Sequence, residues 1–399
     1  SKGTRLKQGD FVMSKIAADE VHGGNTLRKI IDYFSHIIRV PSYYDYVLSY
    51  DKDFCKKPEE YIKKLEWLKN GVETVYDPQC DDIIRVIFMH QFQRAKLAEL
   101  VKMLSGRDFD TREFREDIIE NTYNKLYKGI EKFISEHNFK QFTIAIKSAG
   151  FISNKLINSN MAIDFAYALY LILHDSKEVS SSEIKRLVRR WYVLSVLTGR
   201  YSSSPESSFS KDLRQISEIG VVKTLKNIEA AILSENFWDV QLPQDLTNTS
   251  TNNPTYLVYL AAQVYFNDVS LLSQNICIKE LIELGGDVHH IFPKQYLKDH
   301  NFEKNRYNQE ANYAYLDRPV NVSIGKQSPS DYFQKAWRQC ETKVIECGSI
   351  TDINALKLNL AMNCIPEDIF NMDYSRYTEF LEKRRILMSK KIKKYYYDL

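Results

Sequence analysis

The spacing of apolar residues predicts a bundle of helices in the first half of the chain. Apolar or semi-polar side chains recur at helical spacing in one segment, at Phe114, Ile118, Thr122, Leu126, Ile130 and Phe133. Residues 83–104 and 161–173 are richer in apolar side chains, so we expect these helices to lie deeper in the bundle. Glycine and proline are sparse between about residues 10 and 200, which favours long helices over sheets.

Two polar stretches interrupt this pattern. Residues 202–208 form a serine-rich stretch directly after a basic helix, and they predict a loop. Residues 241–254 hold Leu242-Pro243 and a run of Thr, Asn and Ser that ends at Pro254, which predicts a linker. We therefore expect a helical domain over residues 1–250, with a DNA-binding or regulatory role, and a second, mostly helical domain over residues 251–399.

Composition narrows the functional classes. The chain has 399 residues, 44% of them hydrophobic, and a net charge of only +3, so any basic surface must be local. Its six cysteines include no C-x-x-C pair, which argues against a zinc ribbon and suits a reducing cytoplasm. No apolar run has the length of a membrane span, so we expect a cytoplasmic protein without a membrane partner. The chain begins at Ser1 without a methionine, and a fragment, a processed product or a cloned product would each explain this.

The candidate chemistry lies in residues 287–294, which read D-V-H-H-I-F-P-K. Two histidines stand together there, His289 and His290, and Asn312 and Asn321 follow nine residues apart. Hydrolysis of a phosphodiester needs an activated water, neutralised charge at phosphorus and help for the leaving oxygen. A neutral histidine can take the proton, and a site of His and Asn side chains suits Mg²⁺ or Mn²⁺. These residues predict a metal-dependent nuclease.

The same segment predicts a strand–strand–helix unit. Adjacent residues of a strand point to opposite faces, so His289 and His290 share a face only if a bulge or twist distorts the strand. Residues 312–316 read as a returning strand, and residues 319–327 as a turn into a helix. The fold class that we predict is thus predominantly α, a helical bundle followed by a helical domain that carries a ββα unit.

This segment resembles the His-Asn-His (HNH, ββα-metal) nuclease motif. It is most similar to the C-terminal nuclease half of the GmrSD-type modification-dependent restriction enzymes. That family has an H-H-I-F-P-K run, an N-x-x-x-L strand, then N-x-x-I-G-x-K and P-x-x-Y. The matching residues here are His289 to Lys294, Asn312 with Leu316, Asn321 with Ile324-Gly325-Lys326, and Pro329 with Tyr332.

The resemblance implies a role for each motif residue. His290 would be the general base, and His289 and Asn321 would hold the cation. Asn312 would brace the loop that holds the base, and Lys326 would face the scissile phosphate. A lysine after Ile-Gly is also commonly just solvated, so that alternative stays open for Lys326.

Asp287 precedes the histidine pair where such motifs often carry an acidic residue, so a metal-ligand or orienting role is expected there. Outside residues 285–333 the similarity is loose, and the motif of the family's N-terminal NTP-using domain is absent. We therefore expect a separate NTP-using domain or partner subunit. The resemblance also implies an anti-phage restriction system that cleaves modified DNA.

DNA contacts are expected at Lys294 and on the basic helix with Arg186, Arg189, Arg190 and nearby Arg200. An exposed helix face without a ligand is the commoner explanation of such a helix. The other six histidines are expected to be surface or satisfied core residues.

Two rival functions use the same residues. The site could belong to a ribonuclease or a nonspecific nuclease toxin. The chain could also be a DNA-binding regulatory module whose nuclease site is vestigial, although the intact set of His289, His290, Asn312 and Asn321 argues against this.

Overall fold

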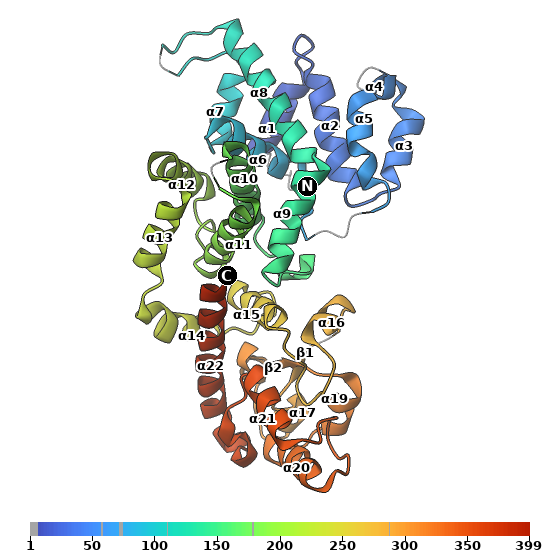
Figure 1. The fold of residues 1–399 in the computed structure, drawn as a ribbon, viewed down its shortest axis with the longest axis vertical. Helices are drawn as coiled ribbons and strands as arrows, with labels where there is room; N and C mark the ends of the chain where they lie inside the picture. The colour runs from blue at the N-terminus through green and yellow to red at the C-terminus, as the bar shows by residue number, and fades with distance from the viewer. Residues whose placement is uncertain (1–6, 57–58, 72–74, 110, 178, 287) are drawn as a thin grey trace. The chain divides into compact units, whose positions relative to one another are not determined.

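The computed structural model describes residues 7–56, 59–71, 75–109, 111–177, 179–286 and 288–399. These residues are predominantly helical, as predicted, and they hold one two-stranded sheet (Figure 1). The chain divides into two compact units, Ser1–Ile146 with Ser159–Asn227, and Lys147–Asn158 with Ile228–Leu399. No helix among the described residues combines the length and the apolar character that a membrane span needs.

The first unit is built from helices, as the apolar spacing predicts. These are α1 (Gln8–Ala17), α2 (Gly24–Ile37), α3 (Tyr43–Tyr50), α4 (Lys52–Lys56), α5 (Glu59–Leu65), η1 (Glu66–Leu68), α6 (Cys80–Phe92), α7 (Leu97–Met103), α8 (Glu116–Ile134), α9 (Glu136–Ser148), α10 (Asn160–Ser176), α11 (Ser181–Leu197), α12 (Pro205–Ile219) and α13 (Val221–Ile232). Helices α9 and α13 end in the second unit. Helix α10 packs against α6 and α11, and most of its residues, from Ala162 to Leu171 and Leu173, are buried, so it forms the centre of this unit.

A buried acid lies within this core. The Asp164 carboxylate accepts a hydrogen bond of 2.8 Å from the Tyr76 hydroxyl and lies 3.3 Å from the Arg85 guanidinium. Burial raises the pKa of Asp164 well above its ordinary value, and neighbouring Asp82 adds to the rise. These polar contacts offset the cost of placing a carboxyl group among apolar helices.

The stretch at residues 202–208 is a loop only in its first part. Helix α12 begins at Pro205, so Glu206, Ser207 and Ser208 are helical. Proline is favoured at the first position of a helix because its missing N–H has no intrahelical partner there. The prediction of a loop over the whole stretch was wrong for that reason.

The second unit combines the sheet with helices, most of them short, and with the long C-terminal helix α22. They are η2 (Asn154–Leu156), the π-helical turn η3 (Phe237–Gln241), α14 (Leu242–Asp245), α15 (Pro254–Tyr265), α16 (Ile278–Glu283), α17 (Lys294–Asp299), α18 (Lys304–Tyr307), η4 (Glu310–Asn312), α19 (Arg318–Ile324), α20 (Pro329–Thr342), α21 (Ile353–Met362), η5 (Glu367–Asn371), η6 (Tyr374–Arg376) and α22 (Tyr377–Asp398). The strands are β1 (Val288–His290) and β2 (Tyr313–Tyr315). Helices α17 and α18 thus lie between the two strands in sequence.

Residues 241–254 are joined to the second unit at a few points, although most of them are exposed. Part of the stretch is helical, because α14 covers Leu242–Asp245. The Asn248 carbonyl accepts a hydrogen bond of 2.9 Å from the Glu310 N–H, and Asn253 Nδ2 donates to the Glu310 carboxylate at 2.9 Å. The two compact units divide at Asn227 and Ile228, whereas the predicted domain boundary near residue 250 lies in this exposed loop of the second unit.

A buried arginine connects α22 to the start of β2. Arg384 is fully buried, and its Nη1 donates to the carbonyls of Ala311 at 2.9 Å and Tyr313 at 2.7 Å. Its Nη2 donates to the Asn363 carbonyl at 3.2 Å. Each of these contacts gives a buried backbone oxygen a hydrogen-bond donor that it would otherwise lack. Arg384 therefore fixes where the chain enters β2.

We expect Arg384→Ala to lower the free energy of unfolding by about 3 kcal/mol, because it leaves buried carbonyls without donors and opens a cavity. Lys390→Ala, on an exposed position of the same helix, serves as the control. Urea unfolding followed by circular dichroism measures both changes. Equal unfolding midpoints for the two variants would contradict the role given to Arg384.

Candidate functional site

The two adjacent histidines lie in a short antiparallel hairpin. The register pairs Val288 with Tyr315, His289 with Ala314 and His290 with Tyr313. The three pairs run in step without a bulge, so His289 and His290 project from opposite faces of the strand. Both are half-buried. The structure thus gives the two histidines different surroundings, and the distortion that would bring them onto one face is absent from this hairpin.

His290 sits in a pocket of aromatic rings. Its ring meets Tyr313 edge-on at 5.2 Å and Tyr307 at 6.2 Å between centroids. Burial lowers the pKa of His290, and the nearby Lys294 ammonium and His289 also lower it, while a hydrogen bond to Asn308 opposes them. A lowered pKa keeps the imidazole neutral at pH 7, which is the form that can accept a proton.

The hydrogen bond to Asn308 distinguishes the two ring nitrogens. His290 Nε2 lies 2.9 Å from Asn308 Oδ1, an oxygen that can only accept. Nε2 therefore carries the proton in the neutral ring, and the lone pair is on Nδ1. Nδ1 makes no hydrogen bond to any described residue. Nδ1 is thus the nitrogen that can take a proton from a water molecule.

Asn312 holds the backbone that follows His290. Its side chain is fully buried, and its Oδ1 accepts a hydrogen bond of 2.8 Å from the Phe292 N–H. Its Nδ2 donates to the carbonyls of Phe292 and Tyr307, both at 3.1 Å. One carboxamide thus joins the segment after β1 to the end of α18. This geometry agrees with the bracing role that the resemblance implies for Asn312.

Ile291 is fixed from two further sides. Its N–H donates to the Asn312 carbonyl at 2.8 Å, and its carbonyl accepts 2.7 Å from the buried Tyr332 hydroxyl of α20. All four backbone polar groups of Ile291 and Phe292 therefore have a partner. The position of His290 relative to α18 and α20 is consequently set by hydrogen bonds on both sides of the chain.

The remaining motif residues lie on or after α19. Asn321 is half-buried in this helix, and Lys326 is exposed directly after the left-handed Gly325 that ends it. No hydrogen bond or ion pair links the Asn321 or Lys326 side chain to His290 among the described residues. Asp287, the expected acidic ligand, lies outside the described residues.

His289 and Asn321 fit a divalent cation by their chemistry. The two ligands would be an imidazole nitrogen and an amide oxygen. Such a pair suits a divalent ion like Mg²⁺ or Mn²⁺ that keeps several of its bound water molecules. No group of three or more His, Cys, Asp or Glu side chains gathers as a metal site in the part of the chain that the structure describes. A closed structural zinc site is thus not formed by the described residues.

The predicted DNA-contacting arginines belong to the first unit. Arg186 pairs with Glu183 on α11, with N–O distances of 2.9 and 2.7 Å, and Arg189 and Arg190 are half-buried on the same helix. The Arg200 guanidinium pairs with the fully buried Asp212 carboxylate, which also accepts a hydrogen bond from Tyr201. Arg200 therefore has a structural role in this unit, whatever else it contacts.

Lys294 belongs to the hairpin region instead. It is the exposed first residue of α17, and its Nζ lies 5.9 Å from the centroid of the Tyr307 ring. The same ring packs against His290. Of the five predicted DNA-contacting residues, Lys294 is the one that the structure places beside the histidine pair.

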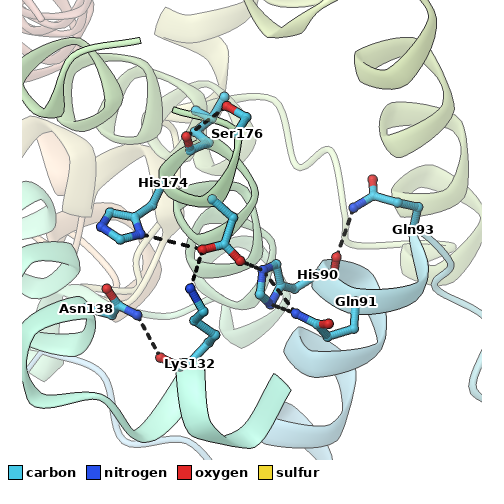
Figure 2. Close-up of polar contacts among 9 residues, drawn as sticks. His90, Gln91, Gln93, Lys132, Asn138, His174 and Ser176 are labelled. Carbon is cyan, nitrogen blue, oxygen red and sulfur yellow. Dashed lines mark hydrogen bonds and ion pairs between the residues drawn. The ribbon is translucent and has the colours of Figure 1, made fainter. Parts of the chain in front are cut away.

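A histidine of the first unit, His90, lies in a polar cluster with Lys132 (Figure 2). His90 Nε2 and Lys132 Nζ lie 3.0 and 2.6 Å from the two oxygens of Asp175. Burial lowers the pKa of His90; burial alone would raise that of Asp175, but the bonds from Lys132 and His90 outweigh it and lower it. The charges are compensated within the cluster, so His90 is a satisfied core histidine as expected.

Sequence reasoning missed three residues of the site. Asn308 lies between short helices where an asparagine reads as a turn residue, and Tyr332 was noted only as part of a motif. Arg384 stands in the sequence within a basic run near the C-terminus. In the run Lys383-Arg384-Arg385, Arg384 lies on the buried face of α22 and its two neighbours do not. The sequence shows three similar cations and does not tell them apart. Contacts between segments that are distant in the sequence leave no spacing pattern in it.

Comparison with known proteins gives no match for this chain among family models, curated protein sequences or solved structures.

We expect Asn308 to set the basicity of His290. Asn308→Leu removes the acceptor that stabilises the imidazolium, so the pKa of His290 should fall; Asn308→Asp supplies a charged acceptor, so it should rise. An NMR titration of the His290 Cε1–H signal in metal-free protein measures both shifts, with His300 as internal reference. The assignment follows from the signal that His290→Ala removes. An identical His290 pKa in all three proteins would rule out the contact.

Proposed function

We propose that the second unit is a metal-dependent DNA endonuclease of the ββα-metal kind. The observation that carries the proposal is the state of His290: a neutral imidazole with one nitrogen engaged by Asn308, on a strand whose following residues are braced by Asn312. The order β1, β2, α19 supports it, because strand, strand and helix follow one another in the order that the resemblance implies.

The residues divide the work of phosphodiester hydrolysis. His290 Nδ1 takes a proton from water, and the water oxygen forms a bond to phosphorus while the bond from phosphorus to the 3′-oxygen breaks. The leaving 3′-oxygen gains a proton from solvent, which gives a 3′-hydroxyl and a 5′-phosphate. His289 and Asn321 would hold a Mg²⁺ or Mn²⁺ ion, which supplies charge neutralisation at the phosphate and at the leaving oxygen. Lys326 would face the scissile phosphate.

The resemblance supplies the setting that we propose for this activity. It is an anti-phage restriction system in which the target is modified duplex DNA. An NTP-using domain or partner subunit would control the cut.

His290→Ala should lower metal-dependent nicking of supercoiled plasmid by about a hundredfold or more, since general-base catalysis typically contributes that much. His300→Ala is the matched control, because His300 also lies in this unit but stacks on Tyr374. Gel electrophoresis of plasmid incubated with Mg²⁺ or Mn²⁺ measures the rates. Unchanged nicking by the His290 variant would show that the base is another group.

Asn321→Ala should weaken binding of Mn²⁺ by about tenfold or more, because it removes one of few protein ligands. Isothermal titration calorimetry measures this in the absence of DNA, so the result does not depend on activity. Asn305→Ala, at an exposed asparagine of α18, is the control. If both variants bind Mn²⁺ as the wild type does, the ligand role of Asn321 is wrong.

Structured RNA separates the proposal from its nearest rival. The same reaction mixtures, with an RNA hairpin in place of plasmid, should give little cleavage. Cleavage confined to RNA would replace the DNA endonuclease with a ribonuclease that uses the same residues.

A further inference from the structure

Helices α17 and α18 form an insertion that is tied to the hairpin at its end. The insertion runs from Lys294 to Asn308, between β1 and β2. Asn308 bonds to His290, and the Tyr307 carbonyl accepts from Asn312. Whatever binds to the insertion is therefore held at a fixed place relative to the histidine.

The insertion carries exposed cations without ion pairs. The insertion has a net charge of +2 with His300 neutral. Its four cations are Lys294, Lys298, Lys304 and Arg306, and its two acids are Asp299 and Glu303. All four cations are exposed. None forms an ion pair with a carboxylate of the described residues.

Aromatic rings position these cations. Lys294 Nζ and Lys298 Nζ each lie 5.9 Å from the centroid of the Tyr307 ring, and the Arg306 guanidinium lies 5.3 Å from that of Phe302. A ring face attracts a cation without neutralising its charge. The charges on these side chains therefore stay available to a ligand.

Other cations of the second unit behave differently. Lys383 pairs with Asp368 and Glu379, and Lys393 pairs with Glu235. Lys279 lies 3.9 Å from Glu283 on α16. Several surface cations of this unit thus pair with carboxylates, whereas the four cations of the insertion do not pair with any described carboxylate.

A polar hollow of about 370 Å³ runs beside the insertion. It is lined by Thr249, Glu303, Lys304, Asn305 and Asn308. Apart from Glu303, these side chains are a cation and hydrogen-bonding groups that suit phosphate and sugar oxygens. The hollow reaches Asn308, the residue that bonds to His290.

We infer that α17 and α18 form the surface that binds the DNA backbone beside the scissile phosphate, with Lys298, Lys304 and Arg306 as phosphate contacts. The inference rests on the proposed function, because a scissile phosphate exists only if the protein cleaves DNA. The binding itself is argued from the exposed cations of the insertion, of which Lys304 lines the hollow.

The salt dependence of DNA binding tests this surface. The triple variant Lys298→Gln, Lys304→Gln, Arg306→Gln is compared with Lys140→Gln, Lys279→Gln, Lys393→Gln, which removes the same net charge from lysines that face carboxylates. Fluorescence anisotropy with a labelled DNA duplex, without divalent cation, gives the dissociation constant over a range of salt concentrations. Urea unfolding confirms that both variants keep the stability of the wild type.

The insertion variant should lose about three from the slope of log K against log salt, since each phosphate contact contributes about 0.9. Its affinity at low salt should fall by about tenfold or more, whereas the control should stay near the wild type. An unchanged slope in the insertion variant, an equal loss in the control, or no DNA binding by the wild type would overturn the inference.

Plasmid nicking keeps this test separate from the proposed chemistry. Nicking that depends on His290 together with an unchanged slope would contradict the surface alone. A reduced slope in a protein that never nicks DNA would support the surface and contradict the nuclease.

Discussion

The candidate site depends on one buried carboxamide. Asn312 accepts from the Phe292 N–H and donates to the carbonyls of Phe292 and Tyr307, so a single side chain joins the end of β1 to the end of α18. A two-stranded hairpin is marginally stable by itself in water, and three residue pairs cannot hold a catalytic side chain in place. The fixed geometry of His290 therefore comes from this clamp more than from the sheet.

Residues far along the chain support the clamp. Tyr332 on α20 bonds to the Ile291 carbonyl, and Arg384 on α22 bonds to the carbonyls of Ala311 and Tyr313, on either side of Asn312. Both side chains are fully buried, so losing either would leave desolvated carbonyl groups. The long C-terminal helix thus stabilises the hairpin through Arg384. Among the described residues, the guanidinium of Arg384 donates to backbone carbonyls and pairs with no carboxylate.

The sequence predicted the elements better than the contacts between them. The apolar pattern located α8 and α10, and the motif segment placed a strand over residues 312–316, where the structure has β2, because these signals are local. Residues 319–327 were expected to be a turn into a helix, but α19 already covers them as far as Ile324. The Asn312 side chain bonds to Phe292 and Tyr307, and its role beside a general base stays a prediction. The bond from Asn308 to His290 and the burial of Arg384 depend on how distant segments pack, and no local pattern encodes that. Residues 241–254 show a related limit: Asn248 and Asn253 bond to Glu310, which is distant in sequence, and no local pattern predicts those two bonds.

The most direct test of the account is the chemistry of the cut ends. Supercoiled plasmid is incubated with the protein and Mg²⁺, and the nicked product is then treated with DNA ligase. Water attack that is assisted by His290 and expels the 3′-oxygen leaves a 3′-hydroxyl and a 5′-phosphate, so the account predicts nicks that form only with the cation and that ligase reseals. Nicks that resist ligase, or that form equally well in the presence of EDTA, would contradict it.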